Sequence, residues 1–245
     1  MSDMLRLFNN HTPLSAARRV KALVNGVGAT QTLAIAVSVI DDKCIKAFDR
    51  RYRVNTSGFI LLSDTSVDPK RLQDATQYGP VNGWGFRRAL RELNLPRQLH
   101  FVDLGCGLGR ACVVAAEYGF ARVTGVELAP EFCAIARRNV ANCRLPAGKR
   151  STINILEMDA LEYCEQTDAD VFFMFRPFSW EFLTRVLNKL GSRAEGLDRP
   201  LTVIYSERML LSQSYAPGIA AYPRFRKTNE IGSFGQAFYV YQCGG

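Results

Sequence analysis

The sequence predicts an α/β protein built around a mostly parallel β-sheet. From residue 99 to residue 206, strand-like segments alternate with segments that have helical periodicity. This alternation is typical of a parallel sheet whose connecting helices cover both faces. A glycine-rich turn follows the first strand, and two more strand-like segments end the chain, so the pattern predicts a seven-stranded sheet.

The predicted elements follow one another in a regular order. Strands are expected at 99–104, 122–127, 151–157, 170–175 and 200–206, and helices at 109–119, 130–143 and 179–191. The tail from Phe225 to Gln242 contains the last two strands, with residues 231–235 as the turn that joins them.

The chain before this alternating region predicts a helical arm. Two helices and an irregular stretch rich in Ser, Asp, Gly and Pro are expected at 15–25, 30–52 and 53–81. Asn82 is a favoured capping residue and is expected to begin a helix that ends near residue 94. We therefore expect residues 1–81 to form an N-terminal helical extension with a loop that covers the ligand, and residues 82–245 to form the ligand-binding domain.

The composition fits a protein of the reducing cytoplasm. Hydrophobic residues make up 47% of the chain, and its seven cysteines contain no C-x-x-C pair and no metal-ligand spacing with either histidine. Free thiols in apolar stretches act as small hydrophobic residues and suit a reducing compartment. The apolar run from Val27 to Ile40 is too short to span a bilayer. We therefore expect a cytoplasmic protein that has neither a metal site nor a transmembrane segment.

The chain is basic, with a formal net charge of +8. Almost all of this excess lies in residues 1–97, and the densest cluster is Lys43, Lys46, Arg50, Arg51 and Arg53. Such a cluster can bind an acidic partner, although it is more often the solvated face of a helix. Aromatic residues do not interleave with the basic ones as in single-stranded nucleic acid binders, so we do not expect nucleic acid as a partner.

Phe101 to Arg110 is the most informative stretch of the sequence. It predicts a buried strand that ends in a glycine turn, followed directly by a helix. The backbone N–H groups of such a turn and of the helix N-terminus can approach a ligand closely. Glu127 ends the next strand-like segment and can accept hydrogen bonds from both hydroxyls of a ribose. Together these features predict a cofactor that contains adenosine.

The charge at this turn distinguishes between the candidate cofactors. The nicotinamide fingerprint is G-x-G-x-x-G, whereas the glycines here occupy positions 105, 107 and 109. Asp103 precedes them, and a carboxylate at this position would repel a pyrophosphate. It would attract the ammonium and sulfonium groups of S-adenosylmethionine, which carries no phosphate. The spacing D-x-G-x-G-x-G therefore favours S-adenosylmethionine over NAD.

These motifs resemble those of the class I (Rossmann-like) S-adenosylmethionine-dependent methyltransferases. The resemblance covers roughly residues 45–245 and is clearest in VDLGCGLGR (102–110) and VTGVEL (123–128). It extends to FDRRYRVNTSGFI (48–60), DATQYGP (74–80), ELAPEFCAIARRNV (127–140), MDAL (158–161) and FFMFRPF (172–178), as in a bacterial group of mostly unassigned substrate. The resemblance implies a Rossmann-like fold whose last strand lies antiparallel in the sheet. It also implies transfer of a methyl group from S-adenosylmethionine.

The resemblance further implies which residues bind the cofactor. In the family, an acid at the position of Asp159 hydrogen-bonds the adenine amino group, and an aromatic residue at the position of Tyr78 covers the methionine end. Alternatively, Asp159 only caps a helix and Tyr78 only packs. Ligands of open parallel sheets bind beyond the carboxyl ends of the strands. We therefore expect the cofactor to contact Tyr78, Asp103, Gly105, Cys106, Gly107, Glu127, Leu128, Asp159, Ala160 and Phe175.

The acceptor side departs from the family pattern at Arg176. Relatives commonly carry Asn-Pro-Phe where this chain has Arg176-Pro177-Phe178. Arginine cannot accept a hydrogen bond from an attacking amine, but it can clamp a carboxylate or a phosphate. We therefore name Arg176, Phe178 and Glu207 as catalytic candidates. We expect either an anionic portion in the acceptor or a methyl-accepting chemistry that differs from N-methylation. Alternatively, Arg176 forms a salt bridge with an acid such as Glu207.

Three functions are compatible with these residues. The first, which we favour, is a methyltransferase that acts on an unidentified small molecule or protein side chain, lysine included. The second is a non-catalytic module that binds S-adenosylmethionine, an alternative kept open by Arg176. The third is an NAD-dependent oxidoreductase. Methyl transfer requires alignment of nucleophile, methyl group and sulfur and the exclusion of water, and it needs no metal.

Overall fold

The computed structural model of the protein describes residues 43–57, 61–209, 213–233 and 235–244. Residues Cys44–Gly245 form one compact unit that contains the whole β-sheet. The helix expected at 15–25 and most of the helix expected at 30–52 lie outside the described residues, whereas residues 43–52 are helical as expected. The domain boundary expected after residue 81 stays a prediction.

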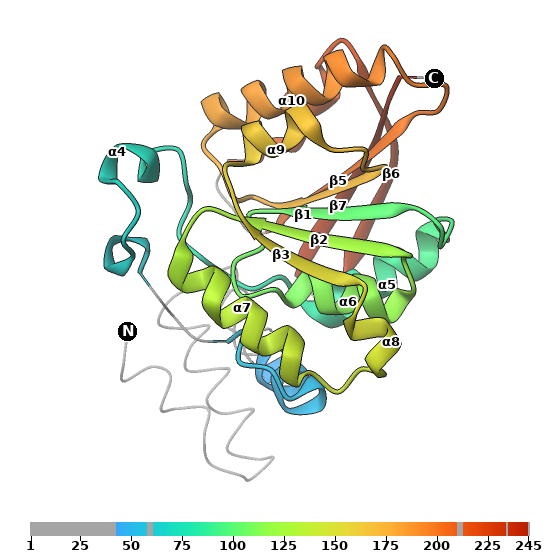
Figure 1. The fold of residues 1–245 in the computed structure, drawn as a ribbon. Coiled ribbons are helices and arrows are strands. Elements are labelled where there is room, and N and C mark those ends of the chain that lie inside the picture. Colours follow the sequence, from blue (N-terminus) through green and yellow to red (C-terminus); the bar gives the residue numbers. More distant parts are fainter. Residues whose placement is uncertain (1–42, 58–60, 210–212, 234, 245) are drawn as a thin grey trace, which may run out of the picture. The chain divides into compact units, whose positions relative to one another are not determined.

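The unit is built on a seven-stranded sheet with the strand order β3-β2-β1-β4-β5-β7-β6 (Figure 1). The strands are β1 (His100–Leu104), β2 (Arg122–Glu127), β3 (Ile153–Glu157), β4 (Val171–Phe175), β5 (Leu201–Arg208), β6 (Phe225–Ser233) and β7 (Gln236–Cys243). Strands β1 to β5 are parallel, and β7 lies antiparallel between β5 and β6. The prediction of a mostly parallel sheet with an antiparallel last strand is confirmed.

Helices cover both faces of the sheet (Figure 1). One face carries residues 43–52, α5 (Gly83–Leu93), α6 (Arg110–Tyr118) and α7 (Pro130–Asn142), and the other carries α9 (Ala160–Gln166), α10 (Trp180–Ala194) and α11 (Ala216–Ala220). Three short helices lie in the connections: η1 (Leu62–Asp64), α4 (Pro69–Leu72) and α8 (Ala147–Arg150). Among the residues that the structure describes, no helix has the length and apolar character needed to cross a membrane.

An aromatic cluster holds the middle of the sheet against α5. The ring of Phe86 stacks on that of Phe173 in β4 with a centroid distance of 4.3 Å, and it lies 6.0 Å from Phe101 in β1 and 5.9 Å from Phe238 in β7. All four side chains are almost fully buried. Since large buried rings dominate core energetics, this cluster fixes the relative positions of β1 and β4, whose ends carry the predicted site.

Local sequence explains where the elements differ from the predicted ones. Helix α10 continues to Ala194, past the end expected at residue 191. Glycine suits position 191 inside this helix because Arg224 packs closely there: an added Cβ would lie only 3.1 Å from Arg224 Cδ. Helix α9 was not predicted; it begins where the side chain of Asp159 accepts a hydrogen bond from Leu161 N. Such a cap allows even a short helix to begin at a defined residue.

Candidate functional site

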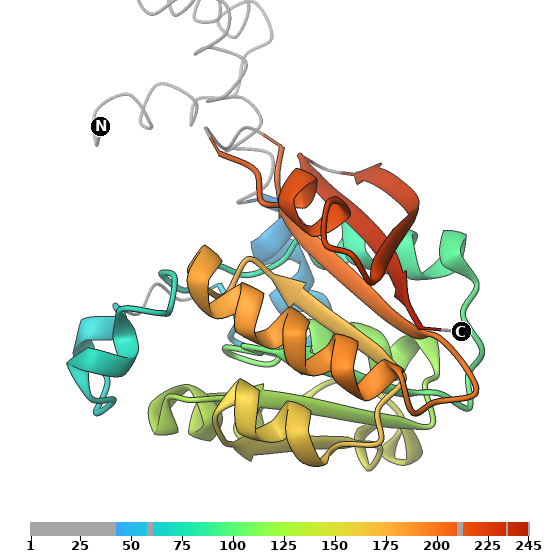
Figure 2. The ribbon, with the colours of Figure 1, turned by 90° about the horizontal axis from the view of Figure 1, so that it is seen from above.

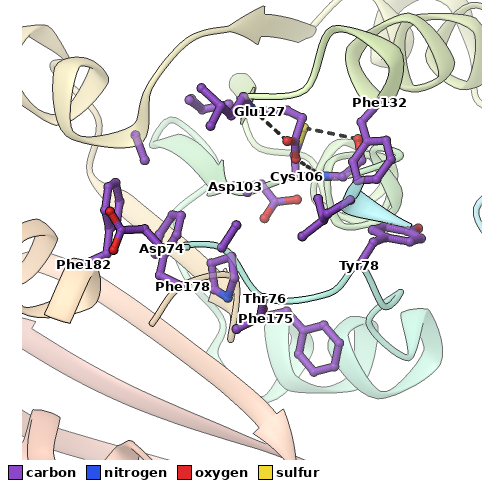
Figure 3. Close-up of a pocket in the computed structure, with 18 of the residues that line it drawn as sticks. Asp74, Thr76, Tyr78, Asp103, Cys106, Glu127, Phe132, Phe175, Phe178 and Phe182 are labelled. Carbon is purple, nitrogen blue, oxygen red and sulfur yellow. Dashed lines mark hydrogen bonds between the residues drawn. The ribbon is translucent and has the colours of Figure 1, made fainter. Parts of the chain in front are cut away.

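A cavity of about 330 Å³ lies beyond the carboxyl ends of β1, β2 and β4 (Figure 3). This volume lies within the usual range for small-molecule sites. The cavity is lined by every residue predicted to bind the cofactor: Tyr78, Asp103, Gly105, Cys106, Gly107, Glu127, Leu128, Asp159, Ala160 and Phe175. The fold therefore brings these predicted residues together, as the rule for open parallel sheets requires.

The glycine turn between β1 and α6 has a backbone that few other residues could adopt. Gly105 and Gly107 have φ angles of +76° and +53°. A Cβ atom at Gly105 would lie 2.5 Å from Pro177 Cβ, and one at Gly107 would lie 2.4 Å from the ring of Tyr78. Glycine is needed at both positions because they combine positive φ angles with close neighbours. The turn is thus packed between Pro177 and Tyr78.

Asp103 is a buried carboxyl group at the end of β1. Its side-chain hydrogen-bond partner is the thiol of Cys112, at 3.8 Å. Burial, together with the nearby carboxylate of Glu127, raises the pKa of Asp103 to about 8. A cation bound at this carboxyl would lower its pKa again, because an opposite charge stabilises the ionised form.

Glu127 is fixed by backbone donors at the end of β2. One carboxylate oxygen accepts a hydrogen bond from Gly107 N at 2.8 Å, and the other accepts from Leu128 N and Ala129 N at 2.8 and 3.0 Å. Burial raises the pKa of Glu127, while these three N–H groups act to lower it. The carboxylate is therefore held in one orientation at the cavity wall, as a group that accepts hydrogen bonds from two hydroxyls would need to be.

Asp159 takes the role that the sequence left as an alternative to adenine binding. Its carboxylate caps α9 through Leu161 N at 2.8 Å and forms an ion pair with Arg71 Nη2 at 2.7 Å. It also lines the cavity. Capping and ligand contact are thus compatible at this residue.

Residues 61–81, which we call the covering segment, pass along one side of the cavity. Its helix α4 lies beyond the end of the sheet, near the starts of α7 and α10 (Figure 2). Thr76 N donates to Pro177 O at 3.0 Å, and Ser179 N donates to Asp74 O at 2.8 Å. Between these bonds, Ala75 forms an isolated antiparallel bridge with Phe178. The covering segment is therefore paired with the acceptor loop, residues 175–179, through the main chain.

Tyr78 lies against the glycine turn, and its hydroxyl donates to Thr56 O at 2.7 Å. Burial raises the pKa of this phenol well above its ordinary value, so the hydroxyl stays protonated. Its ring packs edge-on against Phe132, with centroids 5.4 Å apart. Tyr78 therefore both packs against Phe132 and lines the cavity.

The three predicted catalytic residues are in different surroundings. Phe178 lines the cavity, whereas the described residues that line it do not include Arg176 or Glu207. Arg176 Nη1 lies 3.6 Å from Glu207 Oε2, and the guanidinium lies 4.3 Å from the ring centroid of Tyr215. Glu207 also accepts hydrogen bonds from Tyr215 N and the Ser214 hydroxyl. The ion pair that the sequence left as an alternative is therefore present.

The backbone explains why the Arg176 side chain is directed away from the cavity. Arg176 has a φ angle of +41°, in the left-handed region that residues other than glycine seldom adopt. Its carbonyl oxygen accepts a hydrogen bond from the Thr76 hydroxyl. The main chain of Arg176 thus faces the covering segment, while its side chain packs with Glu207 and Tyr215.

Several residues that shape the site were not among those predicted from the sequence. Arg110 follows the glycine turn directly and is buried, with Nη2 3.0 Å from Asp49 Oδ1 and Nε 2.7 Å from Thr56 Oγ1. Asp74, Phe182 and Arg185 line the far end of the cavity. The position of Arg110 after three glycines was a usable signal, but no local pattern pairs it with Asp49. Among the residues that the structure describes, no cluster of side chains is arranged to hold a metal ion.

The family described as "Methyltransferase domain" matches residues 101–193 of the chain. This range contains β1, the glycine turn, Glu127, Asp159 and the acceptor loop. Residues 101–193 of this chain are thus similar to methyltransferase domains. The antiparallel β7 agrees with what the resemblance to this family implied. No curated protein matches the chain in sequence.

Solved structures share the fold at low sequence identity. YhhF of Escherichia coli is 15% identical, with a TM-score of 0.53 over 68% of this chain and 89% of that chain. An RNA methyltransferase of Salinibacter ruber, in complex with S-adenosyl-L-homocysteine, is 18% identical, with a TM-score of 0.51 over 68% and 94%. The ribosomal protein L11 methylase of Lactobacillus delbrueckii subsp. bulgaricus is 18% identical, with a TM-score of 0.51 over 73% and 84%. At these sequence identities, the similarities show a shared fold alone.

Proposed function

We propose that this protein is an S-adenosylmethionine-dependent methyltransferase. The observation that carries the proposal is the buried Asp103, whose pKa is raised to about 8 at the end of β1. No cation among the described residues pairs with this carboxyl group, so it is costly to ionise, and a ligand ammonium would supply the opposite charge. The structure in complex with S-adenosyl-L-homocysteine among the similar folds supports the same cofactor class.

The residues around the cavity suit the parts of this cofactor. Asp103 would bind the ammonium, Glu127 would accept hydrogen bonds from the ribose hydroxyls, and Asp159 with Ala160 N would bind the adenine edge. Tyr78 would cover the methionine end next to Gly107. The cofactor supplies a methyl group on a positively charged sulfur. The chain's own task is to bind it, orient the acceptor and exclude water.

Phe178 is the predicted catalytic residue best placed to contact an acceptor, because it lines the cavity. Arg176 and Glu207 are proposed as positioning residues for the acceptor loop, since each lies in the ion pair behind it. Methyl transfer does not require a residue that exchanges protons with the acceptor if the acceptor presents a free lone pair. The described lining of the cavity lacks Arg176 and Glu207, and this is therefore compatible with catalysis.

Cytoplasmic location is part of the proposal. It is supported by the seven cysteines, all of which are free thiols. Nucleic acid must also be tested as an acceptor, because two similar folds are named as RNA methyltransferases, one of them as a putative one. The expectation against nucleic acid therefore has no support from the comparisons. An acidic partner for the basic residues before position 97 also stays a proposal.

Calorimetry with S-adenosyl-L-homocysteine tests the proposed function. We expect binding to the purified chain, and a loss of at least about tenfold in affinity for Asp103→Asn, because a charge-assisted bond is removed. Glu162→Gln is the matched control, since this exposed carboxylate lies on α9 away from β1. Binding of NAD in place of S-adenosyl-L-homocysteine would refute the proposal. Formation of S-adenosyl-L-homocysteine with an acceptor then separates an enzyme from a non-catalytic binding module.

A further inference from the structure

The far end of the cavity combines aromatic rings with one carboxylate. Figure 3 shows Asp74, Phe178 and Phe182 at one end of the cavity and Tyr78 with Phe132 at the other. The rings of Phe178 and Phe182 are tilted against each other with centroids 4.8 Å apart. This end adjoins the acceptor loop and is therefore where a methyl acceptor would enter.

Both the main chain and the side chain of Asp74 contact Ser179. Its carbonyl oxygen accepts from Ser179 N at 2.8 Å, and its Oδ1 lies 3.4 Å from the Ser179 hydroxyl. The side chain is 40% exposed and lines the cavity. A carboxylate beside two phenylalanine rings offers a bound cation both an ionic partner and ring faces.

The structure already contains a cation at this place. The guanidinium of Arg185 lies 5.3 Å from the ring centroid of Phe182, and its Nη1 lies 4.0 Å from Asp74 Oδ2. The Arg185 side chain is 62% exposed, so it can turn into solvent at little cost. Asp74 and Phe182 thus form a cation-binding position whose present occupant is replaceable.

Resting on the proposed function, we propose that the methyl acceptor is a cationic amine and that its ammonium group replaces the guanidinium of Arg185 between Asp74 and the rings of Phe178 and Phe182. An anionic acceptor was expected only because of Arg176, and Arg176 pairs with Glu207 behind the acceptor loop. Two other cations that line the cavity are paired elsewhere, Arg71 with Asp159 and Arg110 with Asp49.

The transfer step balances with the groups that are present. The ammonium first loses one proton, which passes through the partly exposed Asp74 carboxylate to water. The nitrogen lone pair then forms a bond to the methyl carbon while the carbon–sulfur bond breaks and its electron pair stays on sulfur. The products are a methylated ammonium and a neutral thioether, with one proton released. No oxidant, reductant or metal is needed.

The binding test uses a simple amine on protein loaded with S-adenosyl-L-homocysteine. We expect n-butylammonium to bind this complex, as measured by NMR titration, and butyrate not to bind. Asp74→Asn is expected to weaken n-butylammonium binding at least about tenfold, because a charge-assisted contact is lost. Arg185→Ala is expected to strengthen it, since the internal cation is removed. Glu181→Gln, an exposed carboxylate in the first turn of α10, is the matched control and is expected to have no effect.

The binding test also separates failure of this inference from failure of the proposed function. If S-adenosyl-L-homocysteine binds but butyrate binds better than n-butylammonium, or Asp74→Asn binds n-butylammonium as well as the native chain does, the amine assignment is wrong and the methyltransferase proposal stands. If S-adenosyl-L-homocysteine does not bind, both fail.

A turnover assay adds a second readout. We expect methylation of a neutral peptide with one lysine, a higher KM for the Asp74→Asn variant, and no methylation when that lysine is acetylated. Methylation of an RNA oligonucleotide but not of the lysine peptide would also overturn the amine assignment.

Discussion

Replacing Asp103 by asparagine should change how the stability of the free protein depends on pH. The pKa of this carboxyl is raised from its ordinary value of 3.8 to about 8 in the folded chain. Because the pKa of this carboxyl is higher in the folded than in the unfolded state, the folded chain binds its proton more tightly. The resulting stabilisation is fully present below about pH 4 and is lost as the pH rises to about 8. The native chain should therefore lose stability over this interval.

The size of the effect follows from the two pKa values. Each pH unit between them is worth about 1.4 kcal/mol, so the full interval corresponds to at most about 6 kcal/mol. Water entering the cavity reduces the cost of the charge, and we expect a loss of about 2–3 kcal/mol between pH 5 and pH 8.5. The Asp103→Asn variant cannot ionise at this position. It should match the native chain near pH 5 and exceed its stability by about 2–3 kcal/mol at pH 8.5.

Urea unfolding at pH 5, 6, 7, 8 and 8.5, followed by circular dichroism, measures this difference. Glu127 keeps some pH dependence in the variant, because burial also raises the pKa of that carboxyl. Glu162→Gln, an exposed substitution of the same type, should follow the native curve. Parallel curves for the native chain and Asp103→Asn would refute the reasoning, because they would mean that Asp103 ionises near its ordinary pKa in the folded protein.

Three further outcomes are expected. The affinity for S-adenosyl-L-homocysteine should rise up to about tenfold per pH unit between pH 6 and pH 7.5, because binding expels the Asp103 proton. Calorimetry in buffers of different ionisation enthalpy detects that proton. An affinity that does not change with pH would contradict this prediction. Gly107→Ala should weaken the same binding at least about tenfold, since its Cβ meets the ring of Tyr78 at a positive φ angle, and unchanged calorimetric affinity would count against a tight turn. Arg110→Met should cost about 3–5 kcal/mol in urea unfolding because Asp49 loses its buried cation, and a cost below about 1 kcal/mol would show that the pair is not stabilising.

The residues proposed to bind the cofactor could be predicted from sequence to line one cavity because they lie at strand ends. Asp103 ends β1 and Glu127 ends β2, and parallel neighbouring strands place such residues at one edge of the sheet. Short-range spacing therefore carries most of the information for this half. The same holds for the glycine turn, whose residue types follow from its backbone angles.

The acceptor side could be predicted only in part. The sequence offered an ion pair between Arg176 and Glu207 as one alternative, but only the left-handed backbone of Arg176 decides in which direction its side chain extends. Asp74 meets Phe182 from a position more than a hundred residues earlier in the chain, so no local period or motif links them. The covering segment shows the same limit, because its pairing with the acceptor loop depends on the folded path of residues 61–81.

The main-chain pairing of Asp74–Thr76 with Pro177–Ser179 has a consequence for how the protein can diversify. Backbone hydrogen bonds depend little on the identity of the side chains that accompany them. Substitutions at positions 74 and 178 can therefore change which molecule the cavity admits, while the strip of chain that carries them stays attached. In this part of the fold, a new specificity requires only new side chains.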